Sequence, residues 1–247
     1  MMEVVALTTG ADADGQVMQT AAMAGEIIRA DVRRVSLAQG TPAGPAAARL
    51  LRALREPGAV LGVLASEQPS RSFWQRIVSS CAKPVIVVPP AARGQRPGIR
   101  RVLLPLDGTP ESARAVAEAV GQFATAGVDL VALHVFNEAT VPMFWDQPAH
   151  AHRAWAEEFL ARNCVRSGAR LELRTGVTGE HIVDVAARER ADMIVLGWSR
   201  QLDPGRARTV RHTVLSAAVP ILLVPLVVPQ KDIGPFDAGD TGDAVST

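Results

Sequence analysis

Val102-Leu103-Leu104-Pro105-Leu106-Asp107-Gly108 is a short apolar run that ends in a carboxylate and a glycine. Such a run, without polar alternation, is typical of a strand that is covered on both faces. Directly after it, Thr109 is a candidate N-cap and Pro110 stands at the first helical position. Apolar residues then recur at helical spacing until Gly127, which can end a helix. The stretch therefore predicts a buried strand followed by an amphipathic helix.

The same alternation continues through the second half of the chain. Apolar runs at 129–136, 192–197 and 220–226 and a more polar run at 169–175 alternate with helical patterns at about 151–166, 178–190 and 207–218. Strands that alternate with helices predict a parallel sheet with right-handed crossovers. The polar run is expected to form an edge strand.

The first half repeats this plan in a shortened form. Residues 81–89 and 217–225 share the order helix end, proline, buried strand, proline, and residues 3–10 parallel residues 101–108. After a strand near 32–38, the first half passes straight into its next helix, so the second helix and third strand of the plan are missing. An internal repeat of this kind predicts two related units.

We therefore predict an α/β fold with two tandem, open, twisted parallel sheets that carry helices on both faces. The expected parts are a shortened first domain at 1–90, a linker at 91–98, a complete second domain at 99–228 and a disordered acidic tail at 229–247. The linker is rich in proline and glycine, which a helix or central strand tolerates poorly.

Composition restricts the function classes. The 247 residues carry a formal charge of +1, so no overall field recruits nucleic acid or an anionic membrane. No basic leader and no apolar run of 18 residues is present, which predicts a cytoplasmic protein without a membrane partner. Arginine far outnumbers lysine, which suggests a bacterial source. Cys81 and Cys164 stand apart and predict neither a disulfide framework nor a zinc site.

The second half resembles a universal stress protein (UspA-like) domain. The resemblance rests on Val102–Gly108 with Ser112, on Leu133-His134-Val135, on Ile194-Val195-Leu196-Gly197 and on Pro220–Pro225. The first half resembles a degenerate copy, so the chain as a whole resembles a tandem member of this family. The resemblance implies an internal pseudo-dimer through the strands near 85–88 and 221–226, or a homodimer, since pairing covers edges that would otherwise be exposed.

The resemblance also implies a crevice at the carboxyl ends of the first and fourth strands, where nucleotide-binding members hold ATP. Asp107, Val135 and Gly197 match the positions that flank the nucleotide. A carboxylate accepts hydrogen bonds from ribose or adenine, and a glycine lets backbone N–H groups approach a phosphate. ATP or another adenine nucleotide is the cofactor that this implies.

The phosphate motif of those members is Gly, two residues, Gly, nine residues, then Gly-Ser/Thr. Gly197 matches the first glycine, Arg200 replaces the second, and Ala207-Arg208 replaces the last pair. Arg200, Arg206, Arg208 and Arg211 crowd the expected crevice, where they either bind phosphate oxygens or face solvent and Asp203. Trp198 either stacks on a base or plugs the crevice.

Other segments leave alternatives open. The aromatic segment 141–148 is a lid, a partner patch or a loop tucked onto its own domain. His150 and His152 near Asp146 are more typical of structural residues than of metal ligands. His134 is expected to be a hydrogen-bonded core residue. In the first half, Thr9 replaces the carboxylate of Asp107 and no glycine follows the strand at 59–65, so we predict no nucleotide there.

The sequence favours a non-catalytic stress-response regulator that works through dimerisation or an unidentified protein partner, with an altered adenine-nucleotide site in its second domain. The alternative is an ATP or AMP sensor with slow or no hydrolysis. An enzyme of the wider adenine-binding α/β superfamily is disfavoured, since the sequence carries no GxxxxGK[ST], GxGxxG, HIGH-like or PP-loop motif.

Overall fold

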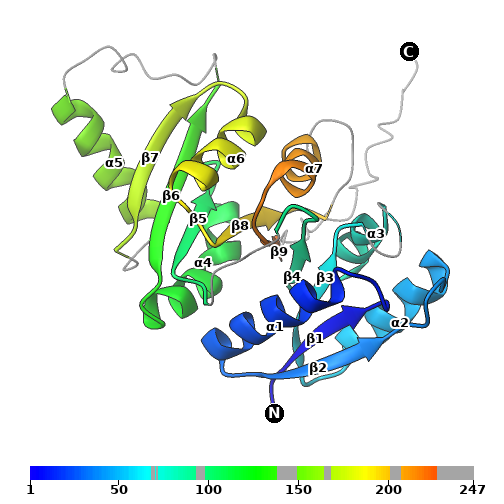
Figure 1. The fold of residues 1–247 in the computed structure, drawn as a ribbon. Coiled ribbons are helices and arrows are strands. Elements are labelled where there is room, and N and C mark those ends of the chain that lie inside the picture. Colours follow the sequence, from blue (N-terminus) through cyan, green and yellow to red (C-terminus); the bar gives the residue numbers. More distant parts are fainter. Residues whose placement is uncertain are drawn as a thin grey trace, which may run out of the picture.

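The computed structural model describes residues 1–67, 70, 72–92, 98–137, 149–163, 168–200 and 207–226. The first half runs through β1 (Glu3–Thr8), α1 (Asp14–Ile28), β2 (Asp31–Ser36), α2 (Ala43–Arg55), β3 (Ala59–Ala65), α3 (Phe73–Ser80) and β4 (Val85–Val88). The second half runs through β5 (Arg101–Pro105), α4 (Pro110–Thr125), β6 (Asp129–Phe136), α5 (Ala149–Asn163), β7 (Arg170–Thr175), α6 (Thr178–Arg188), β8 (Met193–Trp198), α7 (Ala207–Ser216) and β9 (Ile221–Pro225) (Figure 1).

The strands form one nine-stranded sheet in the order β2-β1-β3-β4-β9-β8-β5-β6-β7. All neighbours are parallel except β4 and β9, which pair antiparallel with Val85 opposite Leu223. The two expected sheets are thus joined into a single one. Both joining strands are almost wholly apolar and buried, so leaving either of them as a free edge would expose apolar surface and unpaired backbone.

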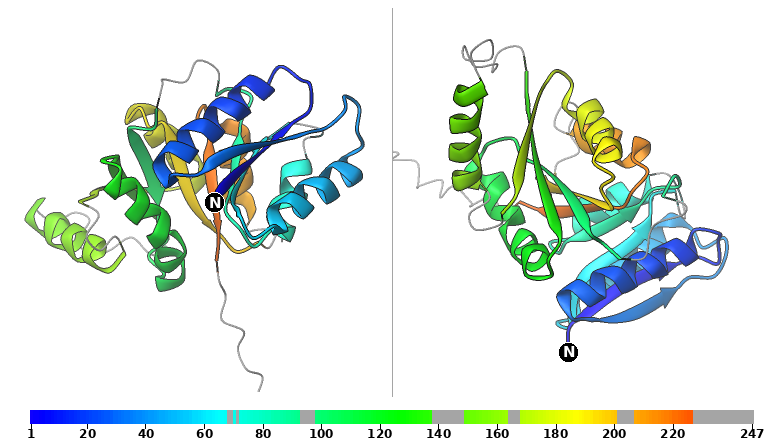
Figure 2. Two further views of the ribbon diagram at one scale, coloured as in Figure 1. Left: turned by 90° about the horizontal axis from the view of Figure 1, so that it is seen from below. Right: turned by 60° about the vertical axis from the view of Figure 1, so that its left-hand side comes forward.

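Helices cover both faces of the sheet (Figure 2). Side chains of α1, α4 and α5 pack with one apolar cluster, and those of α2, α3, α6 and α7 pack with the other. Because side chains alternate along a strand, each buried strand supplies both clusters. The expected α/β class, the parallel strands and the helices on both faces are confirmed.

The first half lacks the helix and strand that the sequence predicted to be missing. The chain leaves edge strand β2, crosses by α2 and returns as β3 on the other side of β1. Cys81, which follows α3, is buried and free, and burial raises the pKa of its thiol. Most of the expected linker, the expected tail and Cys164 lie outside the described residues.

Helix boundaries follow local capping chemistry. The Thr109 side chain accepts a hydrogen bond from the Ser112 amide, and Pro110 opens α4, as the sequence predicted. The expected cap near Thr178 is wrong, because α6 already includes Thr178 and Val177 precedes it without a side-chain cap. Among the described residues, no helix is long and apolar enough to cross a membrane.

Candidate functional site

The topological switch point of the second half lies where β5 and β8 part. The two strands pair only at Val102 with Met193 and at Leu103 with Ile194, although β8 continues to Trp198. From β5 the chain turns toward β6, and from β8 it turns toward β9, so the connections leave in opposite directions. Ligands of open α/β sheets bind at such a switch point, beyond the carboxyl ends of the strands.

Asp107 stands at this switch point with a pre-arranged carboxylate. Its Oδ1 accepts hydrogen bonds from the Thr109 amide at 2.9 Å and from the Thr109 hydroxyl at 2.7 Å. No hydrogen bond to Oδ2 is found within the described ranges, and the residue is exposed. Gly108 supports the turn with φ +84°, a conformation that favours glycine. Asp107 is thus held by one oxygen and can offer the other to a ligand.

Gly197 lets the end of β8 approach the first turn of α4. A Cβ atom at this position would lie 3.2 Å from Ser112 Oγ and 3.4 Å from Leu226 Cδ2. A larger residue would therefore push β8 away from the N-terminus of α4. This N-terminus is the positive end of the helix dipole and favours an anion.

Trp198 does not face the crevice. Its side chain is 2% exposed and belongs to the cluster beneath α6 and α7, with Ala207 and Val210. Stacking on a base and plugging the crevice both require a side chain that faces the crevice, so neither alternative for Trp198 fits this placement. Within the part of the chain that the structure describes, the indole Nε1 has no hydrogen-bond partner.

Arg200 keeps a glycine-like backbone. Its φ is +60°, in the left-handed region that non-glycine residues adopt at a cost of roughly 1–2 kcal/mol. The residue stands where the phosphate motif has its second glycine, so a backbone conformation that favours glycine here carries an exposed guanidinium. Guanidinium groups bind phosphate oxygens through paired N–H donors.

Of the other arginines near the expected crevice, the structure describes Arg208 and Arg211. Arg208 is exposed in the first turn of α7, and this turn contains no acidic residue. A cation at a helix N-terminus opposes the dipole unless an anion lies nearby. Arg211 is also exposed and has a partner of its own. Arg206 and Asp203 lie outside the described residues.

Val135 and His134 point to opposite faces near the end of β6. Val135 is half-buried and packs against the cluster under α6 and α7. His134 lies on the α5 side, where its Nδ1 is 2.8 Å from the Leu106 carbonyl oxygen and donates to it. The expected hydrogen bond of His134 is confirmed, although the side chain is half-buried and not part of the core.

An aromatic group beside this histidine escaped the sequence analysis. Ring centroids of Phe136, Trp155 and Phe159 lie 4.6, 5.6 and 4.8 Å from that of His134. A Cβ on Gly108 would be 3.5 Å from Phe159, so α5 packs close behind the Asp107 turn. The i, i+4 spacing of Trp155 and Phe159 was the available signal, since such residues share one helix face.

The first half has a crevice at the corresponding place. A cavity of about 590 Å³ lies at the carboxyl ends of β1, β3 and β4 and includes Gly10, Asp12 and Ser66 in its lining. Here the amides of Thr9 and Gly10 donate to the carboxylate of Asp14, at 2.9 and 2.8 Å. Asp14 therefore occupies the donors that an anion would need. That the first half binds no nucleotide stays a prediction, and this contact supports it.

Several sequence candidates cannot be placed. The aromatic segment 141–148 and the side chains of His150 and His152 lie outside the described residues. Within the described part of the chain, no group of three or more His, Cys, Asp or Glu side chains is arranged to hold a metal ion.

Comparisons with known proteins agree with this geometry. Residues 98–225 match the model of the Universal stress protein family. A functionally unknown protein from Pseudomonas aeruginosa PAO1 superposes with a TM-score of 0.64 at 12% identity, over 92% of this chain and 93% of that chain. A universal stress protein from Archaeoglobus fulgidus DSM 4304 does so with a TM-score of 0.58 at 13% identity, over 92% and 86%. No curated protein matches the sequence.

Proposed function

The chain belongs to the universal stress protein family, and we propose that it is a non-catalytic stress-response regulator whose second half binds an adenine nucleotide in the β5/β8 crevice. The backbone of Arg200 carries this proposal. Its φ of +60° lies in the left-handed region that favours glycine, at the position where the phosphate motif has its second glycine. This position therefore combines a backbone conformation that favours glycine with a positive charge.

The remaining groups fit the same ligand. The open Oδ2 of Asp107 can accept a hydrogen bond from a ribose hydroxyl or an adenine amine. The first turn of α4 presents its positive end beside Gly197, and Arg200 and Arg208 supply cations. Trp198 has no part in the proposed contacts because it is buried.

The test is a calorimetric titration of the full chain with ATP, ADP, AMP and cyclic AMP, with and without Mg²⁺. Asp107→Ala should weaken every nucleotide at least tenfold, and Asp12→Ala, an exposed carboxylate of the first half, should leave binding unchanged. Arg200→Gly restores the motif glycine but removes the charge, so ATP should weaken more than AMP. Absence of heat up to millimolar ligand would overturn the nucleotide site.

Hydrolysis is the alternative that the same samples resolve. Release of phosphate from bound ATP, lost in Asp107→Ala, would make the protein a slow ATPase. We expect none, because the sequence lacks the catalytic motifs of the known nucleotide hydrolases.

We further propose that the internal pairing of β4 with β9 takes the place of a homodimer through these strands. Each of the two strands already has a neighbour on both sides within the chain, so neither is left as a free edge. Sedimentation equilibrium should give a monomer. A dimer that persists in a chain with Val87→Lys would contradict this and would require another interface.

A further inference from the structure

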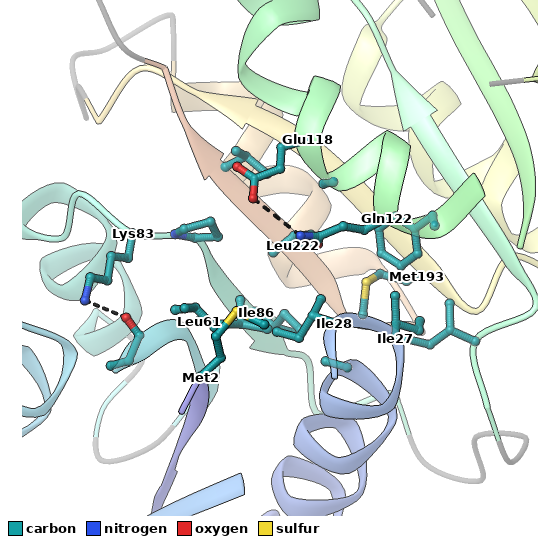
Figure 3. Close-up of a pocket in the computed structure, with 18 of the residues that line it drawn as sticks. Met2, Ile27, Ile28, Leu61, Lys83, Ile86, Glu118, Gln122, Met193 and Leu222 are labelled. Carbon is teal, nitrogen blue, oxygen red and sulfur yellow. Dashed lines mark hydrogen bonds between the residues drawn. The ribbon is translucent and has the colours of Figure 1, made fainter. Parts of the chain in front are cut away.

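A groove crosses the sheet where the two halves meet, on the face that carries α1 and α4 (Figure 3). Its volume is about 400 Å³, and we call it the seam groove. The floor consists of Leu61 from β3, Ile86 from β4, Leu222 from β9 and Met193 from β8. Both halves therefore contribute to it.

The walls come from two helices that face each other. Ile27 and Ile28 lie on α1, whereas Ala115, Ala119 and Phe123 lie on α4. The two alanines leave room because their side chains end at Cβ. Pockets that bind small molecules have volumes of about 300–1,000 Å³ and mostly apolar linings, and the seam groove meets both conditions.

The shape of the groove selects an elongated ligand. Its floor crosses four adjacent strands, and three spacings of ~4.8 Å make a length of ~14 Å. A methylene group takes up roughly the ~30 Å³ that a water molecule occupies in the liquid, so a volume near 400 Å³ holds a chain of roughly ten to thirteen carbons.

Charge is confined to a few positions on the rim. At the end near the start of β4, Lys83 Nζ donates to the carbonyl oxygens of Glu56 at 2.8 Å and Ala59 at 2.5 Å. An ammonium group has three protons, so one remains for a further acceptor. On the opposite wall the carboxylate of Glu118 accepts from Gln122 at 3.4 Å.

We propose that the seam groove binds a medium-chain fatty carboxylate, with its chain across β4 and β9 and its carboxylate at Lys83. The apolar floor removes the chain from water, and Lys83 pairs with the negative head. The ligand touches both halves at once and therefore stabilises their contact. This site is on a different part of the sheet from the β5/β8 crevice, so the proposal is independent of nucleotide binding.

The experiment measures binding of saturated carboxylates from hexanoate to tetradecanoate to the full chain, below their micelle concentrations, by calorimetry and by the rise in Tm. Burial of ~0.8 kcal/mol per methylene predicts about fourfold tighter binding for each added carbon. The gain should stop near dodecanoate, when the groove is full. A gain that continues through tetradecanoate would indicate adsorption and overturn the site, as would no binding.

Two variants locate the ligand. Ala119→Trp fills the groove and should weaken dodecanoate at least tenfold, whereas Ala117→Trp, on the exposed side of the same helix, should not. Lys83→Met should weaken dodecanoate but leave 1-dodecanol unchanged, since the alcohol carries no charge. Equal binding of dodecanoate to Ala119→Trp and to the unaltered chain would overturn the proposal. ATP binding should be the same in all of these variants.

Discussion

In each half the first strand is followed by a turn of similar backbone conformation, but the hydrogen bonds at the two turns differ. Gly10 and Gly108 both adopt a left-handed backbone, with φ of +76° and +84°. In the first half the N–H groups of this turn point at Asp14, whereas in the second half Asp107 belongs to the turn itself and is exposed. The same turn conformation therefore occurs in both halves. In the first half a carboxylate from the protein occupies the N–H donors of the turn, whereas in the second half the carboxylate of the turn itself is exposed to a ligand.

The ends of β3 in the first half and of β8 in the second half also differ. The register of β1 with β3 and of β5 with β8 makes Ala65 the counterpart of Gly197, and Ser66 the counterpart of Trp198. Ala65 already carries the Cβ that would crowd Ser112 in the second half. Alanine at this position leaves less room for an anion between strand and helix than the glycine of the second half does.

The largest expected effect comes from breaking the strand pair that joins the halves. Leu223 is 1% exposed and lies opposite Val85. Leu223→Lys buries an unpaired ammonium group and should lower the free energy of unfolding by on the order of 4 kcal/mol or more. Urea denaturation measures this, and two separate transitions would show that the halves then unfold independently.

A lysine on the surface of the second half provides the control. Leu215 is 62% exposed on α7, so Leu215→Lys should change the free energy of unfolding by no more than about 0.5 kcal/mol. If both variants unfold at the same urea concentration, the β4–β9 pair does not hold the halves together.

The next effect separates the roles of the two carboxylates. Asp14→Ala removes the acceptor for Thr9 and Gly10 at the start of α1, which should cost about 1–2 kcal/mol of stability and leave nucleotide binding in the second half unchanged. Asp107→Ala should cost less stability, because that residue is exposed, but should weaken nucleotide binding at least tenfold. An altered nucleotide affinity in Asp14→Ala would contradict this division of roles.

Thr9 offers a smaller effect of opposite sign. Its Oγ1 is buried and has no hydrogen-bond partner among the described residues, so Thr9→Val should raise the free energy of unfolding by about 0.5–1 kcal/mol. Thr8→Val is the matched control, since Thr8 Oγ1 bonds Ser36 Oγ at 3.2 Å and its loss should destabilise the chain. Thermal unfolding compares the two, and stabilisation by both would mean that the hydroxyl bond contributes nothing.

The smallest effect depends on pH at the edge of the second half. The hydrogen bond from Arg170 lowers the pKa of Glu189 below its usual 4.5. The ionised Glu189 carboxylate therefore stabilises the fold fully above pH 4.5, and this stabilisation is lost as the pH falls through the lowered pKa of Glu189. Compared with Glu189→Gln, the unaltered chain should lose more stability between about pH 5 and pH 3. Arg170→Gln should remove this extra loss of stability at acid pH. If the extra loss persists in Arg170→Gln, it comes from other carboxylates.

Much of the second half could be predicted because its signals are local. Apolar runs without alternation located the buried strands, and Thr109 with Pro110 located the start of α4. The resemblance to the family implied a switch point between the first and fourth strands of the second half. The sheet order confirms that β5 and β8 are neighbours, with Asp107 and Gly197 at the same end of the sheet. The cap of α6 could not be found in this way, because Val177 supplies no side-chain signal.

What the sequence determined by itself was the set of elements, the repeat and the residues at each strand end. The resemblance already implied that the strands near 85–88 and 221–226 join the halves, as β4 and β9 do. The tertiary structure alone decided that Asp14 satisfies the first-half turn, that Trp198 is buried and that Arg200 keeps a left-handed backbone. The physical reason is range. Periodicity and capping depend on neighbours within a few residues, whereas strand pairing, burial and cavity shape depend on contacts between segments far apart in the chain.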